Sequence, residues 1–96
     1  MNSKQRAYLR SLANNVNALF QIGKNGISDN FINQIDEALE ARELIKLHVL
    51  ENSPEDITQL ANTLAQNSNS EIVQIVGNKI TLFRQKNKNS KINLSK

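Results

Sequence analysis

The sequence predicts a two-layer α/β fold, in which helices pack on one four-stranded mixed sheet and the element order is α-β-α-β-α-β-β. Three observations lead to this fold class. A chain of 96 residues has the size of one domain that can fold alone. Stretches with the apolar spacing of helices alternate with short runs that have the spacing of strands. The last two strand-like runs are separated only by Gly77 and Asn78, which indicates a hairpin turn with positive φ at the glycine.

The first half of the chain is expected to contain two helices and two strands. A helix over residues 3–14 has Ser3 as its expected N-cap, because apolar residues follow at spacings i, i+3, i+4 and i+7. Residues 18–22 have the composition of a short strand that ends at a glycine. Ser28 can cap a second helix with apolar residues inward and acids outward. Residues 44–50 alternate between apolar and polar, which indicates a half-buried strand.

The second half begins with a strong helix signal at Ser53 and Pro54, where a capping side chain, a proline and two acids precede a helical apolar pattern. This helix is expected to end at residues 67–70, and strands are expected over residues 72–76 and 79–84. Helical crossovers between the first three strands favour parallel or mixed pairing, and the hairpin adds an antiparallel pair. The order of the strands within the sheet is left open.

Residues 85–96 are predicted to form a flexible basic tail that follows a domain of residues 1–84. This segment has four lysines and only two isolated apolar residues, so it cannot bury enough surface to order itself. Such a tail can be merely solubilising, or its cations can reach the phosphates of a nucleic acid.

Charge is segregated along the chain. Residues 1–28 carry a net charge of +4, residues 29–71 carry −7 and residues 72–96 carry +6. If the two ends of the chain meet in space, they form a basic face opposite an acidic one, which is typical of a nucleic-acid-binding protein. The alternative is a solvated surface on which the charges are separated by chance.

Several classes of function are disfavoured by what the sequence lacks. Without cysteine there is no disulfide, thiolate metal site or cysteine nucleophile, as suits a reducing cytosol. No apolar run approaches the roughly 20 residues of a membrane span, and the first residues do not resemble a signal peptide. His48 is the only histidine and is expected to be a surface residue of a strand. Neither a nucleotide-binding motif nor a catalytic constellation is visible. We therefore expect a cytoplasmic monomer with no cofactor, no metal and no enzymatic activity.

The segment Gly23-Lys24-Asn25-Gly26 joins a strand to a helix and is the best candidate for an anion-binding site. Its glycines permit close backbone approach, while the lysine and the amides of the following helix supply positive potential. A GxxG clamp before a helix is how KH modules hold a nucleic-acid backbone. The glycines could equally serve only the turn, and that alternative stays open.

Aromatic residues are few, so recognition of backbone and shape in structured RNA is expected rather than base stacking. Arg6 and Arg10 are four residues apart and are expected to lie along one flank of the first helix, where their guanidinium groups could grip phosphates. The RNA-binding residues expected from these patterns are Lys4, Arg6, Arg10, Gly23, Lys24, Asn25, Gly26 and Arg84.

Five blocks of sequence together resemble a known family. They are Leu9-Arg10 with Leu12-Ala13, Ile22-Gly23-Lys24-Asn25-Gly26, Glu43-Leu44-Ile45-Lys46, Val73-Gln74-Ile75-Val76-Gly77 and Leu82-Phe83-Arg84. In this order they resemble the YhbY family, the stand-alone bacterial form of the CRM (chloroplast RNA splicing and ribosome maturation) domain. The resemblance covers about Lys4 to Arg84 and departs from the family pattern at Ala18, where a proline is expected.

The resemblance implies an α/β fold similar to the C-terminal domain of translation initiation factor three, and association with precursors of the large ribosomal subunit. It implies no enzymatic activity. It also implies that residues 23–26 are the RNA-contacting loop, with basic support from Arg10, Lys46 and Arg84.

Two functions follow as hypotheses. The first is an RNA-binding ribosome assembly factor that acts on large-subunit precursor ribosomal RNA. The second is a protein-interaction module that docks a ribosomal protein through its acidic helices. Salt dependence separates them, because an RNA complex weakens along a log-linear slope with salt, whereas an interface with an apolar core changes less.

Overall fold

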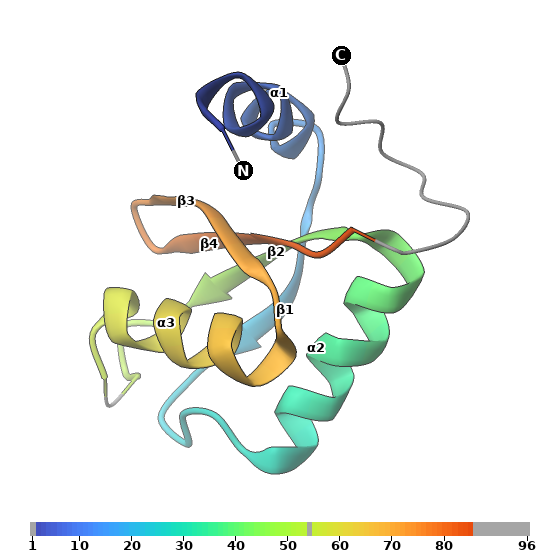
Figure 1. The fold of residues 1–96 in the computed structure, drawn as a ribbon. Coiled ribbons are helices and arrows are strands. Elements are labelled where there is room, and N and C mark those ends of the chain that lie inside the picture. Colours follow the sequence, from blue (N-terminus) through green and yellow to red (C-terminus); the bar gives the residue numbers. More distant parts are fainter. Residues whose placement is uncertain (1, 54, 86–96) are drawn as a thin grey trace.

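The computed structural model describes residues 2–53 and 55–85. The predicted tail therefore lies outside the described residues, except for Gln85. Three helices and four strands follow one another in the predicted order (Figure 1). They are α1 (Ser3–Ala13), β1 (Ala18–Ile22), α2 (Asp29–Arg42), β2 (Leu44–Val49), α3 (Ile57–Ser68), β3 (Glu71–Val76) and β4 (Lys79–Phe83). The predicted α/β class, element order and four-stranded mixed sheet are confirmed, and the strand bounds differ from the prediction by one residue at most.

The strand order, which the sequence left open, is β1-β2-β4-β3. β1 is parallel to β2, and β4 is antiparallel to both β2 and β3. The sheet is therefore mixed, as predicted. Because β1, β2 and β3 run in the same direction, their carboxyl ends lie at one end of the sheet. The loops that follow these three strands are gathered at that end.

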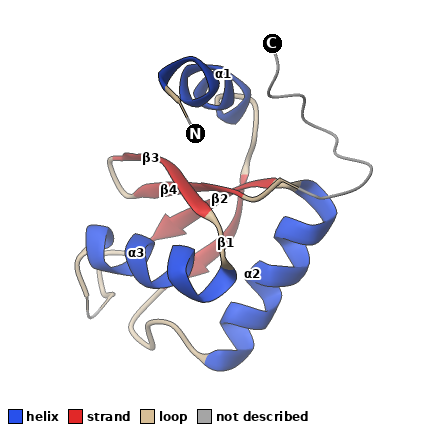
Figure 2. Cartoon of the chain, viewed as in Figure 1, coloured by secondary structure: helices blue, strands red, loops and turns tan. Residues whose placement is uncertain are grey.

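Helices cover both faces of the sheet, so the fold has three layers rather than the two that we expected. Figures 1 and 2 show α1 on one face and α2 with α3 on the other. The reason is that β2 and β4 are apolar on both sides. Ile45 and Leu82 join the larger core under α2 and α3, whereas Leu44 and Phe83 join a smaller core under α1.

The start of α1 differs from the prediction. Its N-cap is Asn2 rather than Ser3, because Asn2 forms a reciprocal capping box with Gln5. The Asn2 side chain accepts a hydrogen bond from the backbone amide of Gln5 at 2.8 Å, and the Gln5 side chain accepts one from the amide of Asn2 at 3.1 Å. The helix ends at Ala13, and Asn14 is its C-cap.

The predicted cap of α3 was also wrong. Asp56 caps this helix and accepts a hydrogen bond from the amide of Thr58 at 2.9 Å. Ser53 instead belongs to a preceding turn, in which its amide donates to the carbonyl of Leu50 at 3.1 Å. Pro54 lies outside the described residues. The cap predicted for α2, Ser28, is confirmed by its 3.1 Å hydrogen bond from the amide of Phe31.

The chain enters β1 at Ala18, the position at which the family pattern predicts a proline. Ala18 pairs with Lys46 of β2, and the register then shifts before Phe20 pairs with Leu47. A bulge at Leu19 accounts for this shift and leaves its side chain 43% exposed. In residues 2–53 and 55–85, no helix is both long and apolar enough to cross a membrane.

Candidate nucleic-acid interface

The segment of residues 23–26 forms a tight turn immediately after β1. The amide of Gly26 donates to the carbonyl of Gly23 at 3.0 Å, which makes Lys24 and Asn25 the two central residues. Both side chains are exposed. The turn therefore presents one cation and one amide to solvent, at the end of the sheet where the parallel strands finish.

The two glycines of this turn are in different situations. Gly26 has φ +65°, a conformation that favours glycine. Gly23 is not in the left-handed region, and a Cβ added there would lie 3.6 Å from both Leu50 Cδ1 and Asn52 Oδ1, which is ordinary contact. The fold thus gives a reason for glycine at position 26 and none at position 23. The backbone conformation of the turn therefore explains Gly26 but not Gly23.

The start of α2 gives the loop a mixed electrostatic environment. Ser28 and the first turn of α2 follow Gly26 closely, so the positive end of the helix dipole lies near the loop. Asp29, the first residue of the helix, is an exposed acid and opposes that potential. Lys24 is therefore the cation on which the attraction of an anion to this turn depends most.

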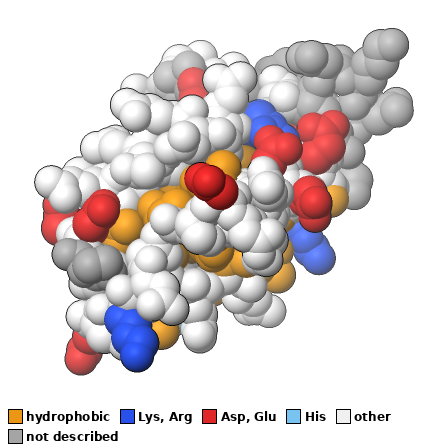
Figure 3. Space-filling model, turned by 90° about the horizontal axis from the view of Figure 1, so that it is seen from below, with side chains coloured by type: hydrophobic (Ala, Val, Ile, Leu, Met, Phe, Trp, Pro, Cys, Tyr) orange, Lys and Arg blue, Asp and Glu red, His pale blue; other side chains and the backbone are white. Residues whose placement is uncertain are grey.

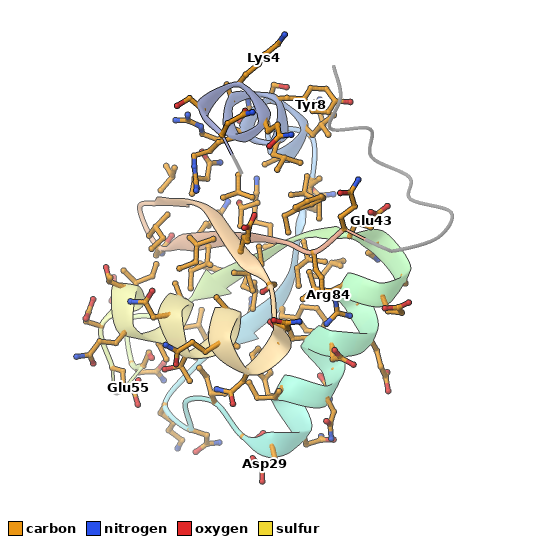
Figure 4. All side chains as sticks on the ribbon, in the orientation of Figure 1. Lys4, Tyr8, Asp29, Glu43, Glu55 and Arg84 are labelled. Atoms are coloured by element: carbon orange, nitrogen blue, oxygen red, sulfur yellow. The ribbon has the colours of Figure 1, made fainter. Side chains whose placement is uncertain are left out.

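The predicted cations of α1 separate into two kinds. Lys4 and Arg10 are exposed, and Figure 4 shows Lys4 pointing away from the body of the protein. Arg6 instead donates from Nη1 to the carbonyls of Ile72, at 2.6 Å, and Val73, at 3.0 Å. Arg6 thus holds α1 on the edge strand β3. It is not a second exposed guanidinium group beside Arg10.

Lys46 and Arg84 also have partners within the fold. Lys46 donates from Nζ to the carbonyl of Ala13 at 2.7 Å and so satisfies the carboxyl end of α1. Arg84 donates from Nη1 to Asp36 Oδ1 at 2.6 Å and to the carbonyl of Ser68 at 2.7 Å. Its Nη2 donates to the carbonyl of Asp36 at 3.0 Å and to Glu40 Oε2 at 3.3 Å. Arg84 therefore ties the end of β4 to α2 and α3 (Figure 4).

The described part of the last block, β3 and β4, lies against α1 of the first block, and four of the six cations of that last block lie outside the described residues. α1 packs on Val73 and Phe83, so the first block and the last strands share one side of the sheet. The other side carries α2, which has four acidic residues, and α3, which has none; Figure 3 shows acidic side chains at several places on this side. Arg84 is an exception, because it faces α2. The turn at residues 23–26 and Lys4 of α1 lie in different parts of the molecule, as the separation of Lys4 and Asp29 in Figure 4 indicates.

Two polar residues that we did not include among the predicted site residues lie on the basic side. Lys79 is exposed and His48 is partly exposed, and the two pair across β2 and β4. The period-2 pattern of each strand predicts that they point away from the larger core, but not that they are neighbours. Among residues 2–53 and 55–85, no cluster of histidine and acidic side chains could hold a metal ion.

Comparison with known proteins settles the family. The model of the CRS1/YhbY (CRM) domain matches residues 1–84. The chain belongs to the CRS1/YhbY (CRM) domain family. This membership confirms the resemblance that the five sequence blocks indicated.

Relatives of the CRM family resemble the chain over most of its length. The probable RNA-binding protein YqeI of Bacillus subtilis is 47% identical over 94 residues, which are 98% of each chain. An RNA-binding protein of Haemophilus influenzae is 29% identical over 84 residues, which cover 88% of this chain and 85% of the relative. Our expectation that the chain is not an enzyme agrees with these names, which describe binding proteins.

The CRM fold is also matched by a solved structure. The solution structure of the hypothetical protein SAV1595 from Staphylococcus aureus, for which RNA binding has been suggested, has a TM-score of 0.81 and 49% sequence identity. The match covers 97% of both chains.

Proposed function

We propose that this CRM-family chain is an RNA-binding ribosome assembly factor that associates in the cytoplasm with precursor RNA of the large ribosomal subunit. The observation that carries the proposal is the turn at residues 23–26. It exposes Lys24 and Asn25, and its Gly23 is neither at positive φ nor in a place where a Cβ would clash. The names of the relatives support the same class of ligand.

In the proposed complex, the turn binds the sugar-phosphate backbone. The ammonium group of Lys24 attracts a phosphate, the Asn25 amide can donate a hydrogen bond, and the two glycines leave room for the strand to approach the protein backbone. Lys4 and Arg10 supply further exposed cations from α1. Arg6, Lys46 and Arg84 contribute to the field while their hydrogen bonds hold α1 and β4 in place. We propose that the protein acts as a monomer.

The test is a binding titration with a structured fragment of large-subunit precursor RNA. Lys24→Glu should weaken binding at least about tenfold, or about 1.4 kcal/mol, because it replaces attraction of a phosphate by repulsion. Asn62→Glu combined with Gln66→Glu is the matched control. These two exposed residues of α3 give the same change in net charge on the acidic side. The control should alter affinity less than about twofold.

The outcomes separate the proposal from its competitor. If the parent binds no RNA at any salt concentration, RNA binding is wrong. If Lys24→Glu is folded and binds as tightly as the control variant, the turn is not the site. Docking of a ribosomal protein through α2 and α3 predicts the reverse pattern, in which the α3 variant changes the affinity for that partner and the Lys24 variant does not.

A further inference from the structure

We propose a second RNA-contacting surface on the part of the sheet that α1 leaves uncovered. It consists of Gln21, His48 and Lys79, which lie side by side on β1, β2 and β4, together with Lys46 in the neighbouring row. Its ligand is the sugar-phosphate backbone of the same RNA that binds the turn at residues 23–26. This inference rests on the proposed function and extends it to a specific part of the sheet.

The strand register places these residues in one row. Gln21 pairs with His48 across β1 and β2, and His48 pairs with Lys79 across β2 and β4. Directly paired residues in a sheet point to the same face. That face is the one that carries α1, because the alternate residues Leu47 and Ile80 belong to the larger core on the opposite side. The three polar side chains therefore form a continuous row across the sheet.

α1 does not extend over this row. Its buried residues Leu9 and Ala13 pack on Leu44, Val73 and Phe83, which are near the other end of the sheet. The residues of the proposed surface are more exposed to solvent than these residues under α1. Lys79 and Gln21 are exposed and His48 is partly exposed.

A hollow of about 180 Å³ lies between the end of α1 and the row. Five of its six lining residues have polar side chains, and two of these are lysines. The lining residues are Asn14, Lys46, Gln74, Val76, Lys79 and Thr81. Lys46 and Lys79 thus both line one concave surface.

The chemistry of this surface suits a polyanion. Lysine ammonium groups, amides, a hydroxyl and an imidazole can all donate hydrogen bonds to phosphate or ribose oxygens. The described residues of the row and of the hollow include no carboxylate. They also include no aromatic ring for base stacking other than the imidazole, which favours contact with the backbone of the RNA. Val76, which is 61% exposed, is the one apolar residue among those of the row and the hollow that an apolar protein partner could contact.

The surface is continuous with the proposed binding turn. Gln21 is two residues before Gly23, at the carboxyl end of β1. Since neighbouring strands are about 4.8 Å apart, the row from β1 to β4 extends roughly 10 Å from the strand that carries the turn. An RNA strand held at Lys24 can therefore continue over the sheet toward Lys79.

The experiment compares Lys79→Glu with Arg42→Glu in titrations with the same RNA fragment between 50 and 200 mM salt. Arg42 is an exposed cation in the last turn of α2, before β2 begins, so the two variants change net charge equally at opposite ends of the sheet. Lys79→Glu should weaken binding at least about fivefold and reduce the log-log salt slope by roughly 0.7–0.9. Arg42→Glu should change affinity less than about twofold.

Backbone amide shifts of the unaltered protein provide a measurement that does not depend on how a variant folds. On titration with RNA, the amides of Gln21, His48 and Lys79 should shift together with that of Lys24. The proposed surface on the sheet is wrong if only the amides of the turn shift. It is also wrong if Lys79→Glu binds RNA as tightly as Arg42→Glu does while Lys24→Glu binds more weakly. In both cases the proposed function stands. If the parent protein does not bind RNA, both are overturned.

Discussion

His48 of β2 lies directly opposite Lys79 of β4 in the antiparallel ladder, and both side chains point to the face of the sheet that carries α1. Their neighbours Leu47 and Ile80 form the next pair and are fully buried on the other face. A slip of one residue in this register would send Lys79 into the core and Ile80 to the surface. Burial of the apolar pair therefore fixes the position of the polar pair, so that the core determines which cations share the basic surface.

The two glycines of the 23–26 turn should respond differently to alanine. Gly26→Ala should cost about 1 kcal/mol or more of folding stability, because its φ of +65° strains a residue with a Cβ. Gly23→Ala should leave stability unchanged or raise it by about 0.4–1 kcal/mol, since its conformation and surroundings accept a methyl group. If the turn binds RNA, Gly23→Ala should nevertheless weaken the complex. Thermal unfolding and RNA titration measure the two effects separately. A Gly23→Ala variant that binds RNA as well as the parent would make this glycine dispensable to both roles.

Arg84 is expected to matter for stability more than for RNA binding. Its side chain is 20% exposed and bridges α2 and α3 through Asp36 and the Ser68 carbonyl. Arg84→Gln should lower stability by about 1–2 kcal/mol. The fall in Tm should be roughly 4–8 °C for each kcal/mol.

Two further variants test this role of Arg84. Arg84→Lys should recover little of the lost stability, because a single ammonium group cannot donate in two directions as the planar guanidinium group does. Glu40→Gln is the control and should change Tm little, since Glu40 is 72% exposed and 3.3 Å from the guanidinium. Equal stability of Arg84→Lys and the parent would contradict this role.

Arg6 and Arg10 should divide the work of α1 between folding and binding. Arg6→Gln removes two hydrogen bonds to β3 carbonyls and should cost about 1 kcal/mol of stability. Arg10→Gln changes the charge equally, but Arg10 is exposed, so stability should stay within about 0.5 kcal/mol. RNA affinity should fall for Arg10→Gln, with a salt slope smaller by roughly 0.9 if one duplex phosphate contact is lost. Thermal melts and titrations of the two variants check the division. Identical unfolding temperatures for both would show that the contacts of Arg6 with β3 are not stabilising.

The sequence by itself determined the local structure. Apolar spacing, strand-like composition and the hairpin turn located the helices and strands of the described residues, and Ser28 was recognisable as a cap because capping depends on residues within one turn. The cap at Asn2 was also locally encoded, since Gln5 follows it by three residues as a capping box requires. The predicted cap Ser3 is instead followed three residues later by Arg6, which cannot complete a capping box. The turn at residues 23–26 was likewise visible as a glycine pattern between a strand and a helix.

Only the tertiary structure decided which distant residues meet. The strand order β1-β2-β4-β3, the position of α1 on its own face, and the partners of Arg6, Lys46 and Arg84 all depend on register and on the matching of apolar surfaces between elements. Spacing along the chain carries no information on these contacts, because the same alternating strand can pair with several neighbours and the same cation can face solvent or a carbonyl. His48 and Lys79 become neighbours for this reason, through the burial of Leu47 against Ile80.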